Sequence, residues 1–188
     1  SLGSRDNRLS VNSNLKGLAV DLPAPFGKAA AETRDSRFSM TLQGPERRFD
    51  AGYGDLVRAA YAAPADKLGE GRGEWWLGTG DAQLPAAQGL RVRGRRETLD
   101  LAPWQEQAAR LGGDDPGGSA RQMLQSVDLS IGQLKAFGTE LNQALVRLSR
   151  GGPAWDLRLD SQEVIGDARV PDAKGAPMVV RLQTLRQP

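Results

Sequence analysis

The sequence predicts a mainly β protein, built as a curved antiparallel sheet that forms a groove and carries one or two short helices. Three observations support this fold class. Apolar and polar residues alternate with a period of two in many segments, as they do in strands with one buried face. Turn residues interrupt these segments about every 8 to 15 residues, a spacing typical of an antiparallel meander. A convincing helical pattern occurs in one segment only.

The first predicted strands lie before residue 96. Leu90 and Val92 alternate with arginines in a clear strand pattern. Weaker alternation predicts strands at residues 9–15, 38–42, 49–53 and 74–79. The segment from Ala59 to Ala65 either forms a helical turn or ends a strand. Gly and Pro residues predict turns at 43–45 and 69–73.

A short helix and a glycine-rich linker are predicted in the middle of the chain. Residues 100–103 can begin a helix, residues 104–111 can form about two turns, and Gly112-Gly113 can end it. The following residues, through Ser119, have the composition of a flexible linker. The predicted organisation is therefore a β-rich segment over 1–111 ending in the helix, a linker over 112–120, and a β-meander over 121–188 that continues the same sheet or groove.

The clearest alternation lies in the C-terminal part. Strands are predicted at Val127 to Ile131, at Trp155 to Asp160 and at 178–184, and a turn is predicted at 151–153. Residues 139–150 fit either a strand or a short helix, because three leucines recur there at spacings of four and three. A strand is favoured, since predicted strands flank this segment closely on both sides.

Composition excludes many kinds of site. The 188 residues contain no Cys and no His, which excludes disulfides, thiolate zinc sites, cysteine nucleophiles and histidine-based catalysis. The chain has 25 Lys and Arg against 23 Asp and Glu, a net charge of +2 that gives no long-range field for nucleic acid. No apolar stretch is long enough to span a membrane. We expect no cofactor, no nucleic-acid partner and no metal.

Short catalytic patterns in the chain have simpler interpretations. Ser13 and Lys16 match a Ser-x-x-Lys pattern, but the helix and the Lys-Thr-Gly strand that accompany it in serine acylases are not visible. Asp114 and Asp115 lie in the predicted linker, which cannot hold an acid/base pair in place. We therefore predict no catalytic residue and no enzyme. The pair Trp75-Trp76 must point to opposite faces of a strand, so that one ring is either sheet cover or the rim of an apolar groove.

Two stretches of sequence together suggest a family. The first comprises residues 13–18 followed by Leu22-Pro23-Ala24-Pro25-Phe26-Gly27-Lys28. The second runs from Val127-Asp128-Leu129 to Phe137-Gly138 and continues through Trp155-Asp156-Leu157-Arg158-Leu159, Gly166, Val170-Pro171 and residues 182–188. In this order the two stretches resemble the YhdP family of AsmA-like envelope proteins of Gram-negative bacteria. The resemblance extends from about Leu9 to the C-terminus and is loose between about Gly44 and Gly73.

The resemblance implies a function in lipid movement. Proteins of this kind are similar to TamB and to bridge-like lipid-transfer proteins, whose sheets curl into a continuous apolar groove. They are longer than this chain, have an inner-membrane anchor, and are associated with phospholipid movement between inner and outer membranes and with the outer-membrane permeability barrier. The chain is then expected to be an internal periplasmic fragment. Its partners would be phospholipid acyl chains and, through the rest of the longer protein, both membranes.

The alternating strands supply candidates for such an apolar face. These candidates would shield acyl chains without directional contacts; they are Leu90, Val92, Val127, Leu129, Ile131, Trp155, Leu157, Leu159, Val180 and Leu182. The same pattern suits the closed core of a structural or interaction module, which could dock a partner chain or self-associate through exposed edge strands. The two alternatives differ in whether the apolar face is open or covered.

Overall fold

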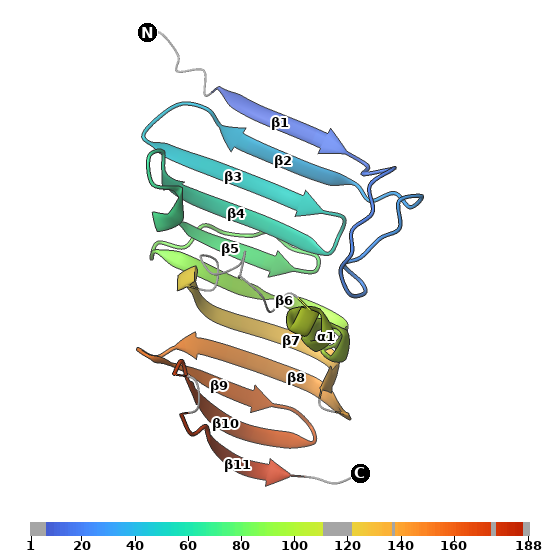
Figure 1. Ribbon diagram of the computed structural model, residues 1–188, viewed down its shortest axis with the longest axis vertical. Helices are drawn as coiled ribbons and strands as arrows, with labels where there is room; N and C mark the ends of the chain where they lie inside the picture. Colours follow the sequence, from blue (N-terminus) through green and yellow to red (C-terminus); the bar gives the residue numbers. More distant parts are fainter. Residues whose placement is uncertain (1–6, 111–121, 137, 174–175, 186–188) are drawn as a thin grey trace. The chain divides into compact units, whose positions relative to one another are not determined.

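The computed structural model describes residues 7–110, 122–136, 138–173 and 176–185 (Figure 1). The chain divides into two compact units, Ser1–Leu90 and Arg91–Pro188. In both units the strands neighbour one another in chain order, as expected for a meander.

The first unit is an open antiparallel sheet. Its strands are β1 (Arg8–Ser13), β2 (Ser36–Thr41), β3 (Glu46–Tyr53), β4 (Val57–Pro64) and β5 (Arg72–Leu77), with a 3-10 helix η1 (Leu68–Glu70) before β5. All consecutive pairs from β1 to β5 are antiparallel. Short turns join β2 to β3 and β3 to β4, and both contain a glycine with positive φ, Gly44 and Gly54. Strand β6 (Gly89–Asp100) begins in this unit and continues in the next.

The second unit contains the remaining elements. Helix α1 (Ala102–Arg110) follows β6, and after it come β7 (Leu124–Ala136), β8 (Thr139–Arg150), β9 (Ala154–Asp160), β10 (Val164–Pro171) and β11 (Val179–Leu185). From β7 to β11 each strand pairs antiparallel with the next. Among the described strands, β11 has a single neighbour, β10, so this sheet also ends in an open edge.

Helix α1 begins at an aspartate cap. The Asp100 side chain accepts a hydrogen bond from the Ala102 N–H at 3.0 Å, and Pro103 occupies the first turn, where its missing N–H has no cost. The Leu101 N–H donates to the Lys135 carbonyl at 2.9 Å, which fixes the start of the helix beside β7.

The alternation of β7 and β8 changes phase in mid-strand. Leu129 and Ile131 are buried before the change, and Leu134 and Ala136 are buried after it, so the buried positions shift from odd to even numbers. On β8, Gln143 has a φ of 52° at the same level of the ladder. Gly132 lies there too, and a Cβ on it would be 2.7 Å from the Glu97 carbonyl oxygen of β6. The irregularity therefore keeps apolar side chains buried along two long strands.

These observations confirm the predicted mainly β, antiparallel fold class with short helices. Residues 139–150 form a strand, the preferred alternative, and residues 59–64 lie within β4 rather than in a helical turn. The β10 strand was not predicted, because the small residues Gly166 and Ala168 occupy its apolar positions and weaken its pattern. The predicted linker, 112–120, lies outside the described residues.

Candidate functional site

One face of the first unit is apolar from β1 to β5. Residues directly opposite in an antiparallel ladder share a face, so the register defines it. Leu9 lies opposite Met40, and Val11 lies opposite Phe38. The same side continues through β3, β4 and β5. We name this surface the first apolar face; it consists of Leu9, Val11, Phe38, Met40, Phe49, Ala51, Val57, Ala59, Tyr61, Trp75 and Leu77.

The first apolar face is only partly covered. Leu9, Val11, Phe38 and Trp75 are between 39% and 49% exposed. In its middle, the ring centroids of Phe38 and Phe49 are 6.3 Å apart, and those of Phe49 and Tyr61 are 6.0 Å apart. Such tilted aromatic pairs stabilise the sheet surface by about 0.5–1.5 kcal/mol each beyond area burial. The unit therefore presents an aromatic surface instead of enclosing it.

The β1–β2 connection closes one end of this face. Phe26 is buried, and its carbonyl accepts a hydrogen bond from the Tyr53 hydroxyl at 2.8 Å. Arg34 lies over the Tyr53 ring, with its guanidinium carbon 4.9 Å from the centroid. The Leu22-to-Lys28 motif thus folds back against the strand ends.

The second unit also has one apolar face, and eight predicted residues lie on it. One row across the strands contains Val127, Leu148, Leu157, Ala168 and Val180. The next row contains Leu129, Val146, Leu159, Gly166 and Leu182. We name this surface the second apolar face; it consists of these two rows with Ile131, Ala144, Trp155 and Val170.

Exposure rises across the second apolar face towards its edge. Ile131 on β7 is 1% exposed, Trp155, Leu157 and Leu159 are half-buried, and Leu182 on β11 is 61% exposed. The face therefore supplies the buried core under β7 and β8 and an open apolar surface on β10 and β11.

Leu90 and Val92 stand two residues apart on β6, so they share one face of that strand. A Cβ on Gly73 would lie 3.0 Å from Leu90 Cδ2 and 2.7 Å from Tyr61 Cδ2, which places Leu90 beside the first apolar face. Eight of the ten predicted residues thus lie on the second apolar face, Leu90 lies beside the first, and Val92 shares the side of β6 that carries Leu90. Their predicted contact with lipid stays a prediction.

Sequence reasoning missed most of the first apolar face. Of its residues, only Trp75 was considered as a groove rim, through the Trp75-Trp76 pair. Trp75 is the exposed ring, and Trp76, on the other face, donates to the Thr79 carbonyl at 3.1 Å. The available signal was the alternation in residues 9–15, 38–42 and 49–53. It looked weaker because these segments are short and Ser13 and Ala51 interrupt their larger apolar residues.

The opposite faces carry charged residues, although Ala60, Ala62 and Glu74 are buried on that face in the first unit. In the second unit Arg158 pairs with Asp167 at 3.0 Å and Arg169 pairs with Asp156 at 2.9 Å, all four on the face opposite to Leu157. Exposed ion pairs of this kind stabilise the fold by about 0–1 kcal/mol each. Their main effect is therefore to keep this face of the sheet solvated. Arg150 is an exception, because it lies on the second apolar face opposite Trp155. Its guanidinium carbon is 5.1 Å from the centroid of the Trp155 ring.

The described residues contain no group of three or more His, Cys, Asp and Glu placed to hold a metal ion. Within the same part of the chain, no helix is long and apolar enough to cross a membrane. Ser13 ends a β-strand and its Oγ accepts the Leu15 N–H at 3.0 Å, a local turn contact rather than a nucleophile on a helix.

Together, these features define a class of β protein: open antiparallel sheets with one partly exposed apolar face and one charged face. Comparison with protein families then gives the family. The chain matches the family model described as YhdP protein over residues 2–188, and it belongs to the YhdP family. The searches of curated proteins and of solved structures gave no match.

Proposed function

We propose that this chain is a periplasmic segment of a bridge-like lipid-transfer protein, in which the two apolar faces shield phospholipid acyl chains. The observation that carries the proposal is the partial exposure of apolar residues on one face of each sheet, from Leu9 and Phe38 to Val180 and Leu182. Membership of the YhdP family supports it, because that family resembles lipid-transport bridges. The lipid would move between inner and outer membranes and support the permeability barrier of the outer membrane.

The energetics of lipid transfer explain why such a surface is useful. An acyl chain of about 16 carbons costs on the order of 12 kcal/mol to expose to water, at about 0.8 kcal/mol per CH₂. A strand ladder with apolar residues on one side lowers this cost at every step along the face. The required contacts are non-directional, so the activity needs no catalytic residue, and we propose that the chain is not an enzyme.

The decisive experiment uses two adjacent valines of β11. Val180 lies on the second apolar face and is 51% exposed, and Val179 lies on the charged face and is 50% exposed. We expect the Val180→Asp variant to lose most phospholipid that co-purifies with the chain from a bacterial periplasm, as measured by native mass spectrometry. The Val179→Asp variant should retain it, because only the first substitution places a carboxylate among the acyl chains.

A photo-crosslinking residue at each valine gives an independent reading of the same face. Crosslinks to phospholipid are expected from position 180 and not from position 179. Equal lipid content in both variants, together with equal crosslinking, would contradict the proposal.

A second candidate function follows from the sheet edges. Among the described strands, β1 pairs only with β2 and β11 only with β10, so each has a free hydrogen-bonding edge. Such an edge can add a strand from a partner chain or a second copy. Lipid-free protein that also refuses added phospholipid, and that elutes as a dimer in size-exclusion chromatography, would favour this structural or interaction module.

A further inference from the structure

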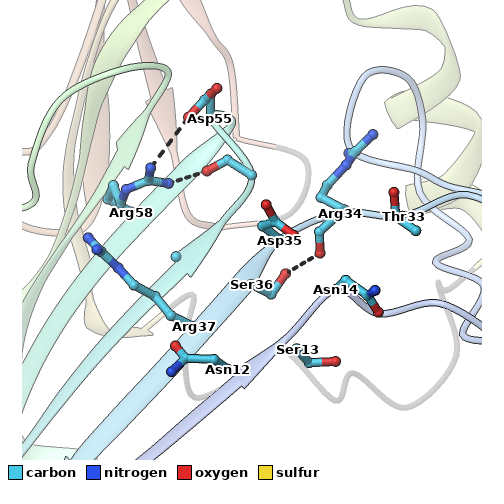
Figure 2. A pocket seen from close by; sticks show the side chains of 12 residues that line it. Asn12, Ser13, Asn14, Thr33, Arg34, Asp35, Ser36, Arg37, Asp55 and Arg58 are labelled. Carbon is cyan, nitrogen blue, oxygen red and sulfur yellow. Dashed lines mark hydrogen bonds and ion pairs between the residues drawn. The ribbon is translucent and has the colours of Figure 1, made fainter.

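The polar face of the first unit carries a depression of about 750 Å³ at one end of β1 to β4 (Figure 2). Residues of these four strands and of the β1–β2 and β3–β4 connections line it. Arg37 lines the depression, whereas its neighbour Phe38 belongs to the first apolar face, because successive residues of a strand point to opposite sides. A ligand bound in the depression is therefore separate from acyl chains bound at Phe38.

Gly52 brings two arginines together there. One cross-strand row contains Asn12, Arg37, Gly52 and Arg58 in register. A Cβ on residue 52 would be 3.2 Å from Arg37 Cγ and Nε and 3.5 Å from Arg58 Cδ. Both side chains thus lie over the glycine, and Figure 2 shows them side by side.

The charges of the depression leave one cation without a protein partner. Arg58 is held by the exposed Asp55 carboxylate at 3.5 Å and by the Gly54 and Val57 carbonyls. Arg34 donates to the Pro25 carbonyl at 2.9 Å. Arg37 makes no hydrogen bond or ion pair with any described residue, although Asp35 lines the same depression. Three arginines against two aspartates leave one positive charge in excess.

We infer that this depression binds a singly charged phosphodiester group, with Arg37 as its principal ligand. A guanidinium presents two parallel N–H donors that match two phosphate oxygens, and an anion between Arg37 and Arg58 relieves the repulsion of the two cations. The Asn12 amide, next in the row, is a further donor. A single negative charge balances the excess, whereas a doubly charged phosphate monoester would face uncompensated repulsion from Asp35 and Asp55. The phosphodiester belongs to either a lipid headgroup at a bilayer surface or a soluble glycerophosphodiester.

The test is a titration of the whole 188-residue chain followed by two-dimensional NMR of its backbone amides. The probes are glycerophosphoglycerol in solution and, separately, vesicles of phosphatidylglycerol, with vesicles of phosphate-free digalactosyl diacylglycerol for comparison. We expect saturable changes at the amides of Asn12, Gly52 and Gly54 with at least one phosphodiester probe. Changes with the soluble probe alone identify a soluble ligand, and changes with phosphatidylglycerol vesicles identify a lipid headgroup; either result supports the site.

Three variants make the result specific, two at Arg37 and one control at Arg48. Arg37→Ser should weaken binding at least tenfold, and Arg37→Lys, which keeps the charge and loses the paired donors, should fall between it and the unmodified chain. Arg48→Ser removes an arginine from the same face of β3, where Arg48 pairs with Glu46 at 3.5 Å, and should leave binding unchanged. Amide spectra away from the depression show whether each variant is folded. Sodium acetate serves as a control anion without phosphate. The inference is overturned if no saturable changes occur, if Arg37→Ser binds as well as the unmodified chain, or if acetate gives the same changes as the phosphodiester probes.

Discussion

At the scale of single residues, Glu163 shows how one side chain completes an irregular sheet. Strand β8 pairs with β9 only from Leu145 to Arg150, so Asn142 lies beyond the end of β9. Glu163, in the β9–β10 turn, accepts the Asn142 N–H at 2.8 Å and the Asn142 side-chain amide at 2.7 Å. The Gln162 N–H donates to the Asn142 carbonyl at 3.0 Å. A turn therefore replaces the missing strand partner.

This contact predicts a pH dependence of stability. The side-chain hydrogen bond from Asn142, followed by its backbone hydrogen bond, lowers the pKa of Glu163 below its ordinary value of 4.5. The folded state then binds the proton more weakly than the unfolded state. The stabilisation is complete above the unfolded-state pKa and is lost as the pH falls through the folded-state pKa.

Urea unfolding of the unmodified chain and of Glu163→Gln should therefore differ at pH 7, and the difference should shrink below about pH 4.5. Carbon-detected NMR of the Glu163 carboxyl gives its pKa directly. A free-energy difference that stays constant from pH 7 to pH 3, or titration of Glu163 at or above its ordinary value, would contradict this account.

At the scale of elements, the β1–β2 connection is organised around a buried lysine. Lys28 Nζ donates to the Leu15 carbonyl at 2.8 Å, to the Ala29 carbonyl at 3.1 Å and to the Leu18 carbonyl. The Lys28 backbone pairs with Val20 in an isolated bridge, and the Gly17 N–H donates to the Ala30 carbonyl at 2.8 Å. One ammonium group thus satisfies three carbonyls that a strand would otherwise pair, and it lets a long connection fold compactly.

Replacing Lys28 by Met keeps an unbranched side chain, one heavy atom shorter, and removes the three hydrogen bonds of the ammonium group. We expect a loss of about 1–3 kcal/mol in the free energy of unfolding, the usual cost of leaving buried polar groups unsatisfied. Proteolysis should become faster within residues 14–35. Lys16→Met, at an exposed position of the same connection, is the control and should change stability by less than about 0.5 kcal/mol. Equal behaviour of the two variants would show that the three carbonyl contacts do not hold the connection.

At the scale of the molecule, apolar strand faces are buried in one region, where they stabilise the fold, and exposed to solvent in another. On the second apolar face Ile131 is fully buried, whereas Val180 and Leu182 are exposed. An ordinary β core would bury all three, and a purely lipid-binding surface would expose all three. The division separates the residues that hold the fold from those available to a ligand.

This division predicts opposite outcomes for one kind of substitution. Ile131→Asp should unfold the second unit, because a buried carboxylate without a partner and a lost isoleucine side chain together cost more than about 3 kcal/mol. Val180→Asp should change stability by less than about 1 kcal/mol. Circular dichroism during thermal unfolding measures both. Unfolding by Val180→Asp would show that β11 is also covered, and would favour a closed interaction module.

The fold class and most strands follow from the sequence alone, because alternation with a period of two is a local property. It also placed Val127, Leu157 and Val180 among apolar positions, and the register confirms that they share a face. Asp100 and Pro103 marked the start of α1 for the same local reason.

Which apolar residues are buried and which are exposed depends instead on tertiary packing. Ile131 and Val180 both lie in alternating segments. β7 has a strand on each side, whereas β11 has one described neighbour, so Ile131 is buried and Val180 is exposed. The aromatic pairs of the first apolar face depend on register between β2, β3 and β4, which a single strand does not contain. Arg37, Gly52 and Arg58 likewise lie on three different strands. The close approach of the two arginines over Gly52 therefore cannot be predicted from their spacing in the sequence.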